Sequence, residues 1–246
     1  MPTIRAFWAP KAAAHESEWE DAAAFDEARQ VVAVADGASS SYRAGMWSSR
    51  LVEEFLVRPP QLAPGLIAFH QWVASVADGF QSASEAVSET SWYASDASRR
   101  GSFATFVGVT LLSGVNGGRF VAVQVGDACL FHTRGNQLLT ALPTRDAEGF
   151  DSTPDLLGSS AYEESHGAEA GVYCEGIIEP GDVLYLTTDA MGSAMLALAE
   201  ANQPIWRAGR DLGPRRFRSM VDELRKADVL EDDDVTLVRV LMEEST

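Results

Sequence analysis

Runs of apolar, often β-branched residues recur along the chain and predict its strands. The clearest runs cover residues 31–35, 103–112, 119–125, 128–133, 183–188 and 235–242. Several of these runs are followed at once by Asp or Gly, which is typical of a strand that ends in a tight turn. We therefore expect six strands with buried side chains and short connections.

Helices are predicted where apolar residues are spaced by three or four positions. Residues 46–97 fit two helices that break near Arg58-Pro59-Pro60, because proline ends a helix. Further helices are predicted at 190–201 and 214–227. The segment after Leu139 is polar and has little periodicity. We therefore expect a mobile flap, which would extend from about Leu142 to Gly171. Strands and helices come in blocks rather than in strict alternation, which favours an α+β layered fold.

Length and charge narrow the class of protein. With 246 residues, 46% of them hydrophobic, the chain is expected to form one domain over residues 1–246. Its 36 acidic and 19 basic residues give a formal net charge of -17. Such a charge repels nucleic acid and anionic lipid, so we expect neither nucleic acid nor membrane as a partner.

The cellular compartment is inferred from what the chain lacks. No window has the roughly 20 apolar residues that a membrane span needs, and the first residues do not resemble a signal peptide. Cys129 and Cys174 stand far apart in unrelated contexts. This spacing fits neither a disulfide framework nor a zinc site, and it suits a reducing cytoplasm.

Three acidic residues mark the ends of predicted strands. Asp36 follows Val-Val-Ala-Val-Ala, Asp189 follows Val-Leu-Tyr-Leu-Thr-Thr, and Asp233 lies just before Val-Thr-Leu-Val. Each acid alone is more often a turn, a helix cap or part of a solvated loop. Together at the edge of an apolar sheet, however, their carboxylates would repel one another and need a cation to stay ionised.

The histidines do not suggest a different kind of metal site. They occur at positions 15, 70, 132 and 166, without the spacing of metal ligands. A site built from oxygen ligands alone selects hard ions, so magnesium or manganese is expected rather than zinc.

Six short motifs, in order along nearly the whole chain, resemble the type 2C (PPM) metal-dependent Ser/Thr protein phosphatases. They are Glu20-Asp21-Ala22, Val34-Ala35-Asp36-Gly37, Gly101-Ser102-Phe103-Ala104-Thr105, Val125-Gly126-Asp127-Ala128, Gly181-Asp182-Val183 through Thr188-Asp189-Ala190, and Asp233-Asp234-Val235-Thr236. The last resembles the family's Asp-Asn-Ile-Thr. The resemblance implies a four-layer αββα sandwich of two antiparallel sheets flanked by helices.

The resemblance also implies a site for two divalent cations, Mn or Mg, at one end of the sandwich. By position, Asp36 would bridge both cations, and Asp189 and Asp233 would bind the first. The Gly37 carbonyl and Glu20 would bind the second. Asp21 would assist through bound water. Asp127 matches an acid that helps to hold a third ion in the family, but Ser193 replaces the other Asp of that third site, and a turn acid between two strands is the favoured interpretation of Asp127.

The implied activity is hydrolysis of phosphoserine and phosphothreonine by attack of a metal-bridging hydroxide. The implied partners are a phosphoprotein substrate and a cognate Ser/Thr kinase that phosphorylates it, and the expected state is a monomer. One position departs from the family, because Glu16 stands where an Arg usually binds the substrate phosphate. Arg43, in the loop after Asp36, is the best placed replacement, although an unremarkable surface arginine is an equally good interpretation.

Two functions remain open on the sequence. A metal-dependent phosphatase is favoured by the retention of Asp36, Asp189 and Asp233. A weak or inactive relative that binds phosphoproteins as a regulatory module is favoured by Glu16. A phosphatase with an aspartyl nucleophile is set aside, since its Asp-x-Asp pattern would need an acid at Ala38.

Overall fold

A computed structural model describes residues 2–11, 19–86, 101–114, 117–150, 153–160 and 170–243. Over these residues the strands form two antiparallel sheets. One sheet has five strands in the order β1 (Pro2–Ala9), β11 (Val235–Met242), β10 (Asp182–Thr187), β6 (Cys129–Arg134) and β7 (Gln137–Leu142). The six-stranded sheet runs β2 (Asp21–Asp26), β3 (Val31–Gly37), β4 (Phe103–Gly114), β5 (Gly117–Val125) and β9 (Val172–Ile178), and β8 (Leu157–Gly158) pairs with β4.

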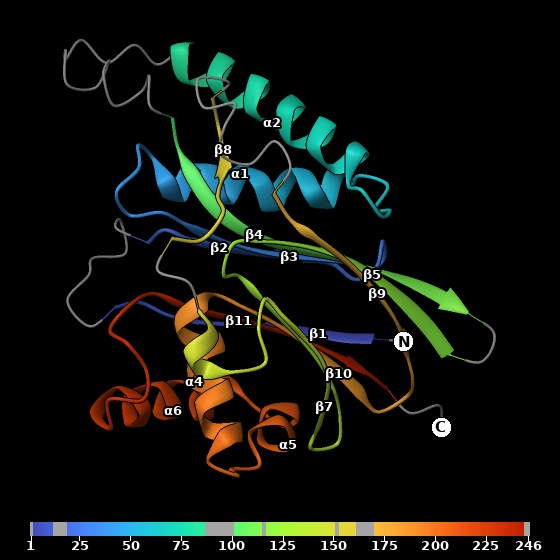
Figure 1. Ribbon diagram of the computed structural model, residues 1–246, viewed down its shortest axis with the longest axis vertical. Helices are drawn as coiled ribbons and strands as arrows, with labels where there is room; N and C mark the ends of the chain where they lie inside the picture. Colours follow the sequence, from blue (N-terminus) through green and yellow to red (C-terminus); the bar gives the residue numbers. More distant parts are fainter. Residues whose placement is uncertain are drawn as a thin grey trace.

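Helices cover the outer faces of both sheets (Figure 1). Helices α1 (Ala44–Val57) and α2 (Ile67–Ala86) pack on the six-stranded sheet. On the five-stranded sheet lie α4 (Asp189–Glu200), α5 (Ile205–Arg210) and α6 (Pro214–Lys226), beside the short 3-10 helix η2 (Ala147–Gly149). The four layers confirm the predicted αββα sandwich.

Three apolar layers hold this sandwich together. The middle layer lies between the sheets and contains side chains such as Val34, Val107 and Leu186. The outer layers join each sheet to its helices through large aromatic side chains, among them Trp47 on α1 and Phe217 on α6. The central strands are therefore buried on both faces, which is why they appear as continuous apolar runs in the sequence.

The six predicted strands are the six central ones, β3, β4, β5, β6, β10 and β11, with ends that differ by a few residues. The sequence did not predict β1, β2, β7 or β9, and α5 was also missed. In the described part of the segment after Leu139, β7 continues to Leu142, and η2 and β8 follow it, elements that the sequence did not predict. Residues 151–152 and 161–169 of the expected flap lie outside the described part of the chain. The predicted helical stretch is helical to Ala86, and residues 87–97 lie outside the described part of the chain.

None of the described helices combines the length and the apolar character that crossing a membrane requires.

Candidate metal centre

Asp36 lies at the end of β3, where the chain turns towards α1. Its cross-strand neighbours are Asp21 on β2 and Thr105 on β4. Gly37 follows Asp36 and lies against the first turn of α1, where an added Cβ would stand 2.7 Å from the carbonyl carbon of Ala44. The turn therefore needs a glycine beside Asp36, because a backbone group cannot move aside as a flexible side chain can.

Asp189 comes from the other sheet and begins α4, directly after β10 and Thr188. A carboxylate in the first turn of a helix is stabilised by the amide dipoles that point towards it. The Asp36 carboxyl group lies within hydrogen-bonding reach of both Asp21 and Asp189. The two sheets thus bring three acids together that are far apart in the sequence.

The electrostatics of this group are unfavourable when no cation is present. Burial raises the pKa of Asp36 well above its usual value, and the neighbouring Asp21 and Asp189 carboxylates raise it further. Burial likewise raises the pKa of Asp21 to about 8, although a hydrogen bond from the Thr236 hydroxyl, 2.7 Å from Asp21 Oδ2, acts against this rise. Burial and the nearby Asp233 and other acids also raise the pKa of Asp189.

Asp127 lies in the turn between β5 and β6, near the same group. Burial and the charge of Asp189 raise the pKa of Asp127 to about 6. The preceding Gly126 has a φ of 76°, and a Cβ there would stand 2.5 Å from the Asp155 carbonyl oxygen. The turn that carries Asp127 therefore depends on a glycine at position 126.

The acidic run before β11 contains two residues with different environments. Asp233 is exposed, and its charge acts on Asp36 and Asp189. Asp234 is buried, and its carboxylate accepts hydrogen bonds from the backbone amides of Lys11 and Glu20 at 3.0 and 3.2 Å. Sequence reasoning named Asp233 and gave Asp234 no role. The one signal for Asp234 was its position at the Asn of the family's Asp-Asn-Ile-Thr motif.

Glu20 and Gly37 are joined through the backbone, since the Gly37 amide donates to the Glu20 carbonyl oxygen at 3.2 Å. The Glu20 carboxylate accepts a hydrogen bond from the Ser39 hydroxyl and lines a cavity of about 690 Å³. Arg43 lines the same cavity, at the N-terminus of α1, with its guanidinium 5.0 Å from the centre of the Tyr42 ring. Arg43 is thus near Glu20, whereas Glu16 lies outside the described residues.

The donor set fits hard divalent cations. Asp21, Asp36 and Asp189 offer only oxygen atoms, and the raised pKa values show carboxylates that a cation would stabilise. Within the described ranges, no three His, Cys, Asp or Glu side chains already have the arrangement of a metal site. The fit therefore rests on the chemistry of the donors and on their shared location.

No protein-family model matches the sequence, and no curated protein matches it either. Solved structures match in fold. The Mycobacterium tuberculosis serine/threonine phosphatase PstP/Ppp gives a TM-score of 0.60 at 15% identity, over 99% of each chain. PppA, a regulatory component of T6SS in Pseudomonas aeruginosa, gives 0.58 at 16% identity, over 98% of this chain and 97% of PppA.

A third match is the catalytic domain of PstP in complex with 2 manganese ions. Its TM-score is 0.61 at 16% identity, over 99% of each chain. The chain therefore has the fold of the type 2C protein phosphatases, as its motifs predicted.

Proposed function

We propose that this chain is a phosphoprotein phosphatase that uses two divalent cations, Mn or Mg, to hydrolyse phosphoserine and phosphothreonine. The observation that carries the proposal is the meeting of Asp21, Asp36 and Asp189 at one place, with pKa values raised by burial and mutual repulsion. The fold shared with serine/threonine phosphatases, one of them a manganese complex, supports it.

In this proposal the cations would be held by the carboxylates of Asp36, Asp189, Asp233 and Glu20 and by the Gly37 carbonyl oxygen. Asp21 and Asp127 would add negative charge around them. When bound, the cations would lower the pKa of an attacking water and offset the charge of the phosphate oxygens. Thr236 orients the Asp21 carboxylate through its hydrogen bond. The chain's protein partners would be a phosphoprotein substrate and the kinase that phosphorylates it. The phosphatase itself would act as a monomer in the cytoplasm.

The substrate phosphate would lie near Arg43. This residue stands at the N-cap of α1, where the helix dipole favours an anion, and it shares a cavity with Glu20. Its backbone has a φ of 50°, a left-handed conformation that costs a non-glycine residue about 1 kcal/mol.

Replacing Arg43 by Ala should raise KM about tenfold and leave manganese affinity unchanged, since one charged hydrogen-bonding partner of the substrate phosphate is lost. An unchanged KM would remove Arg43 from the phosphate site.

The test of the activity is hydrolysis of p-nitrophenyl phosphate and of a phosphothreonine peptide, with and without Mn²⁺. Asp36→Asn and Asp189→Asn should each lower manganese-stimulated turnover by at least about 100-fold, because each loses an ionised ligand. Asp78→Asn, at an exposed position on α2, is the matched control and should retain full turnover.

A non-catalytic phosphoprotein-binding module is the second candidate, and the observation that favours it is Glu16 at the position of the family's phosphate-binding Arg. Calorimetric titration with Mn²⁺ separates the two candidates. Manganese binding without turnover on either substrate would reject the enzyme and favour the binding module.

A further inference from the structure

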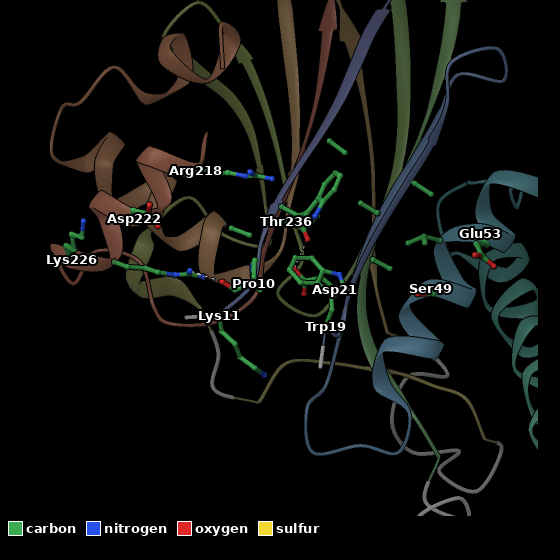
Figure 2. A pocket seen from close by; sticks show the side chains of 18 residues that line it. Pro10, Lys11, Trp19, Asp21, Ser49, Glu53, Arg218, Asp222, Lys226 and Thr236 are labelled. Atoms are coloured by element: carbon green, nitrogen blue, oxygen red, sulfur yellow. Dashed lines mark hydrogen bonds between the residues drawn. The ribbon is translucent and has the colours of Figure 1, made fainter. Parts of the chain in front are cut away.

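A cavity of about 1160 Å³ lies at one edge of the sandwich, between the edge strands β1 and β2. Helix α6 forms one wall and α1 the other, and Figure 2 shows Arg218 and Lys226 on the first side and Ser49 and Glu53 on the second. We call this cavity the edge groove. It extends to Asp21, so it reaches the carboxylate group.

The edge groove is open because small side chains line both strands. Ala6 and Ala9 belong to β1, and residues 22–24 of β2 are all alanine. Trp8 continues the face of β1 on which Ile4 and Ala6 contact the layer between the sheets, yet it is 60% exposed. A large apolar side chain that lines a cavity and remains exposed is typical of a surface that binds a partner.

The charge of α5 and α6 is opposite to that of the whole protein. Residues 205–226 contain seven basic and three acidic residues, so this segment has a formal charge of +4, whereas the whole chain has a formal charge of -17. The basic residues are Arg207, Arg210, Arg215, Arg216, Arg218, Arg225 and Lys226, and the acidic ones are Asp211, Asp222 and Glu223. An acidic partner is repelled by the protein as a whole and attracted to this part of it.

The basic side chains that line the edge groove have different tasks. Arg225 donates hydrogen bonds to the carbonyl oxygens of Pro10 at 2.8 Å and Asp233 at 2.6 Å, so it fixes the groove wall. Arg218 and Lys226 are exposed on α6, and Lys11 lies at the end of the groove (Figure 2). On the α6 side three basic side chains outnumber one acid, Asp222, whereas the α1 side carries the acidic Glu53.

We infer that the edge groove binds an extended, acidic segment of a partner protein. Acidic side chains of that segment pair with Arg218 and Lys226, and its apolar side chains pack on Trp8 and the alanines of β2. The outer edge of β2 pairs with no other strand among the described residues, so its backbone groups can bind an extended chain as an added strand. This binding does not depend on the proposed phosphatase activity.

The test uses fluorescein-labelled peptides of about ten residues in which Glu alternates with Val, with Gln and Lys versions as charge controls. In fluorescence anisotropy titrations the Glu peptide should bind at least about tenfold more tightly than the Gln peptide, and added salt should remove this difference. Trp8→Ala should weaken peptide binding about tenfold, because an aromatic contact in the groove is lost.

A matched pair of variants separates the edge groove from the helix in general. The double variant Arg218→Glu with Lys226→Glu should lower the affinity for the Glu peptide at least about tenfold. The double variant Arg215→Glu with Arg216→Glu should change that affinity less than about twofold. Arg215 and Arg216 are exposed on the same helix but do not line the groove.

Equal weakening by both pairs would overturn the inference, as would Gln and Glu peptides that bind alike. Concentration-dependent dimerisation that Trp8→Ala abolishes would assign the groove to a second copy of this chain instead. Turnover of p-nitrophenyl phosphate is measured in parallel, so that loss of peptide binding and loss of activity are seen separately.

Discussion

Asp182 offers a strong test of the electrostatic reasoning, because it lies in a buried ion pair at the start of β10. Its side chain is 0% exposed and lies within hydrogen-bonding distance of four groups from three residues. Arg134 Nε and Nη2 donate to its two oxygens at 2.7 and 3.0 Å, and the Glu179 amide donates at 2.9 Å. His132 Nε2 lies 3.0 Å from Asp182 Oδ2. Replacement of Asp182 by Asn keeps the shape and removes the charge.

The expected cost of Asp182→Asn is about 2 kcal/mol of unfolding free energy at pH 7, the value of a charge-assisted hydrogen bond lost in a buried place. The full penalty for breaking a buried ion pair is larger, but Arg134 is 45% exposed and water can solvate it. For a chain of this length the melting temperature should fall by roughly 4 to 8 °C.

The pH dependence has a definite sign. Burial alone would raise the pKa of Asp182, but the hydrogen bonds from Arg134, the Glu179 amide and His132 outweigh it and hold the pKa below its usual value. A carboxyl group with a lowered pKa stabilises the folded state above its unfolded pKa, about 3.9, and this stabilisation is lost as the pH falls through the folded pKa. The difference between the wild type and Asp182→Asn should thus be constant from pH 7 to about 5 and shrink below about 4.

Urea unfolding at several pH values measures this difference, and a constant m-value would show that the variant unfolds in the same way. Glu179→Gln is the matched control, since Glu179 pairs with the same Arg134 at 3.0 Å but is half exposed. It should leave the urea midpoint almost unchanged. The reasoning is refuted if Asp182→Asn has no measurable cost at pH 7, or if Glu179→Gln costs as much.

Two glycine substitutions should have opposite effects. Gly37→Ala should destabilise the protein by about 1 to 3 kcal/mol and weaken Mn²⁺ binding, because its Cβ would stand 2.7 Å from the Ala44 backbone beside Asp36. Urea unfolding measures the first effect and calorimetric titration the second. An unchanged manganese affinity would show that this turn does not position the metal ligands. Gly79→Ala should stabilise the exposed middle of α2 by about 0.5 to 1 kcal/mol, since its Cβ would meet only Arg50 Nη2 at 3.6 Å; a lower melting temperature would contradict this.

The central strands could be predicted from the sequence because both of their faces are buried, so that Val31 to Ala35 and Val183 to Leu186 are apolar without interruption. The strands that were missed, β1, β2, β7 and β9, are the outer strands of the two sheets. β2 reads Asp-Ala-Ala-Ala-Phe-Asp, which has neither alternation nor β-branched residues. Such strands form because a neighbouring strand offers backbone partners, and a single-sequence pattern does not contain that information.

The candidate site could be predicted in part for a related reason. Asp36 and Asp189 follow central strands, and a strand end fixes the place of the next side chain. The acidic run before β11 is different, because four successive acids give no indication of which one points inwards. Tertiary contacts determine which acid is buried. The backbone amides of Lys11 and Glu20 need a hydrogen-bond acceptor, and the Asp234 carboxylate is that acceptor. These contacts also fix the backbone of the neighbouring Asp233.

The small side chains that hid β2 from the sequence pattern also create the edge groove. Large apolar side chains in their place would have made β2 recognisable and would have filled the space between β1 and β2. Alanines on β2 and at Ala6 leave that space open, while Trp8 remains exposed beside it. Substituting Ala23, which lies in this space, by Leu should therefore fill the groove and weaken binding of an acidic peptide. If the small residues served only to let the strands pack, the same substitution would instead destabilise the fold.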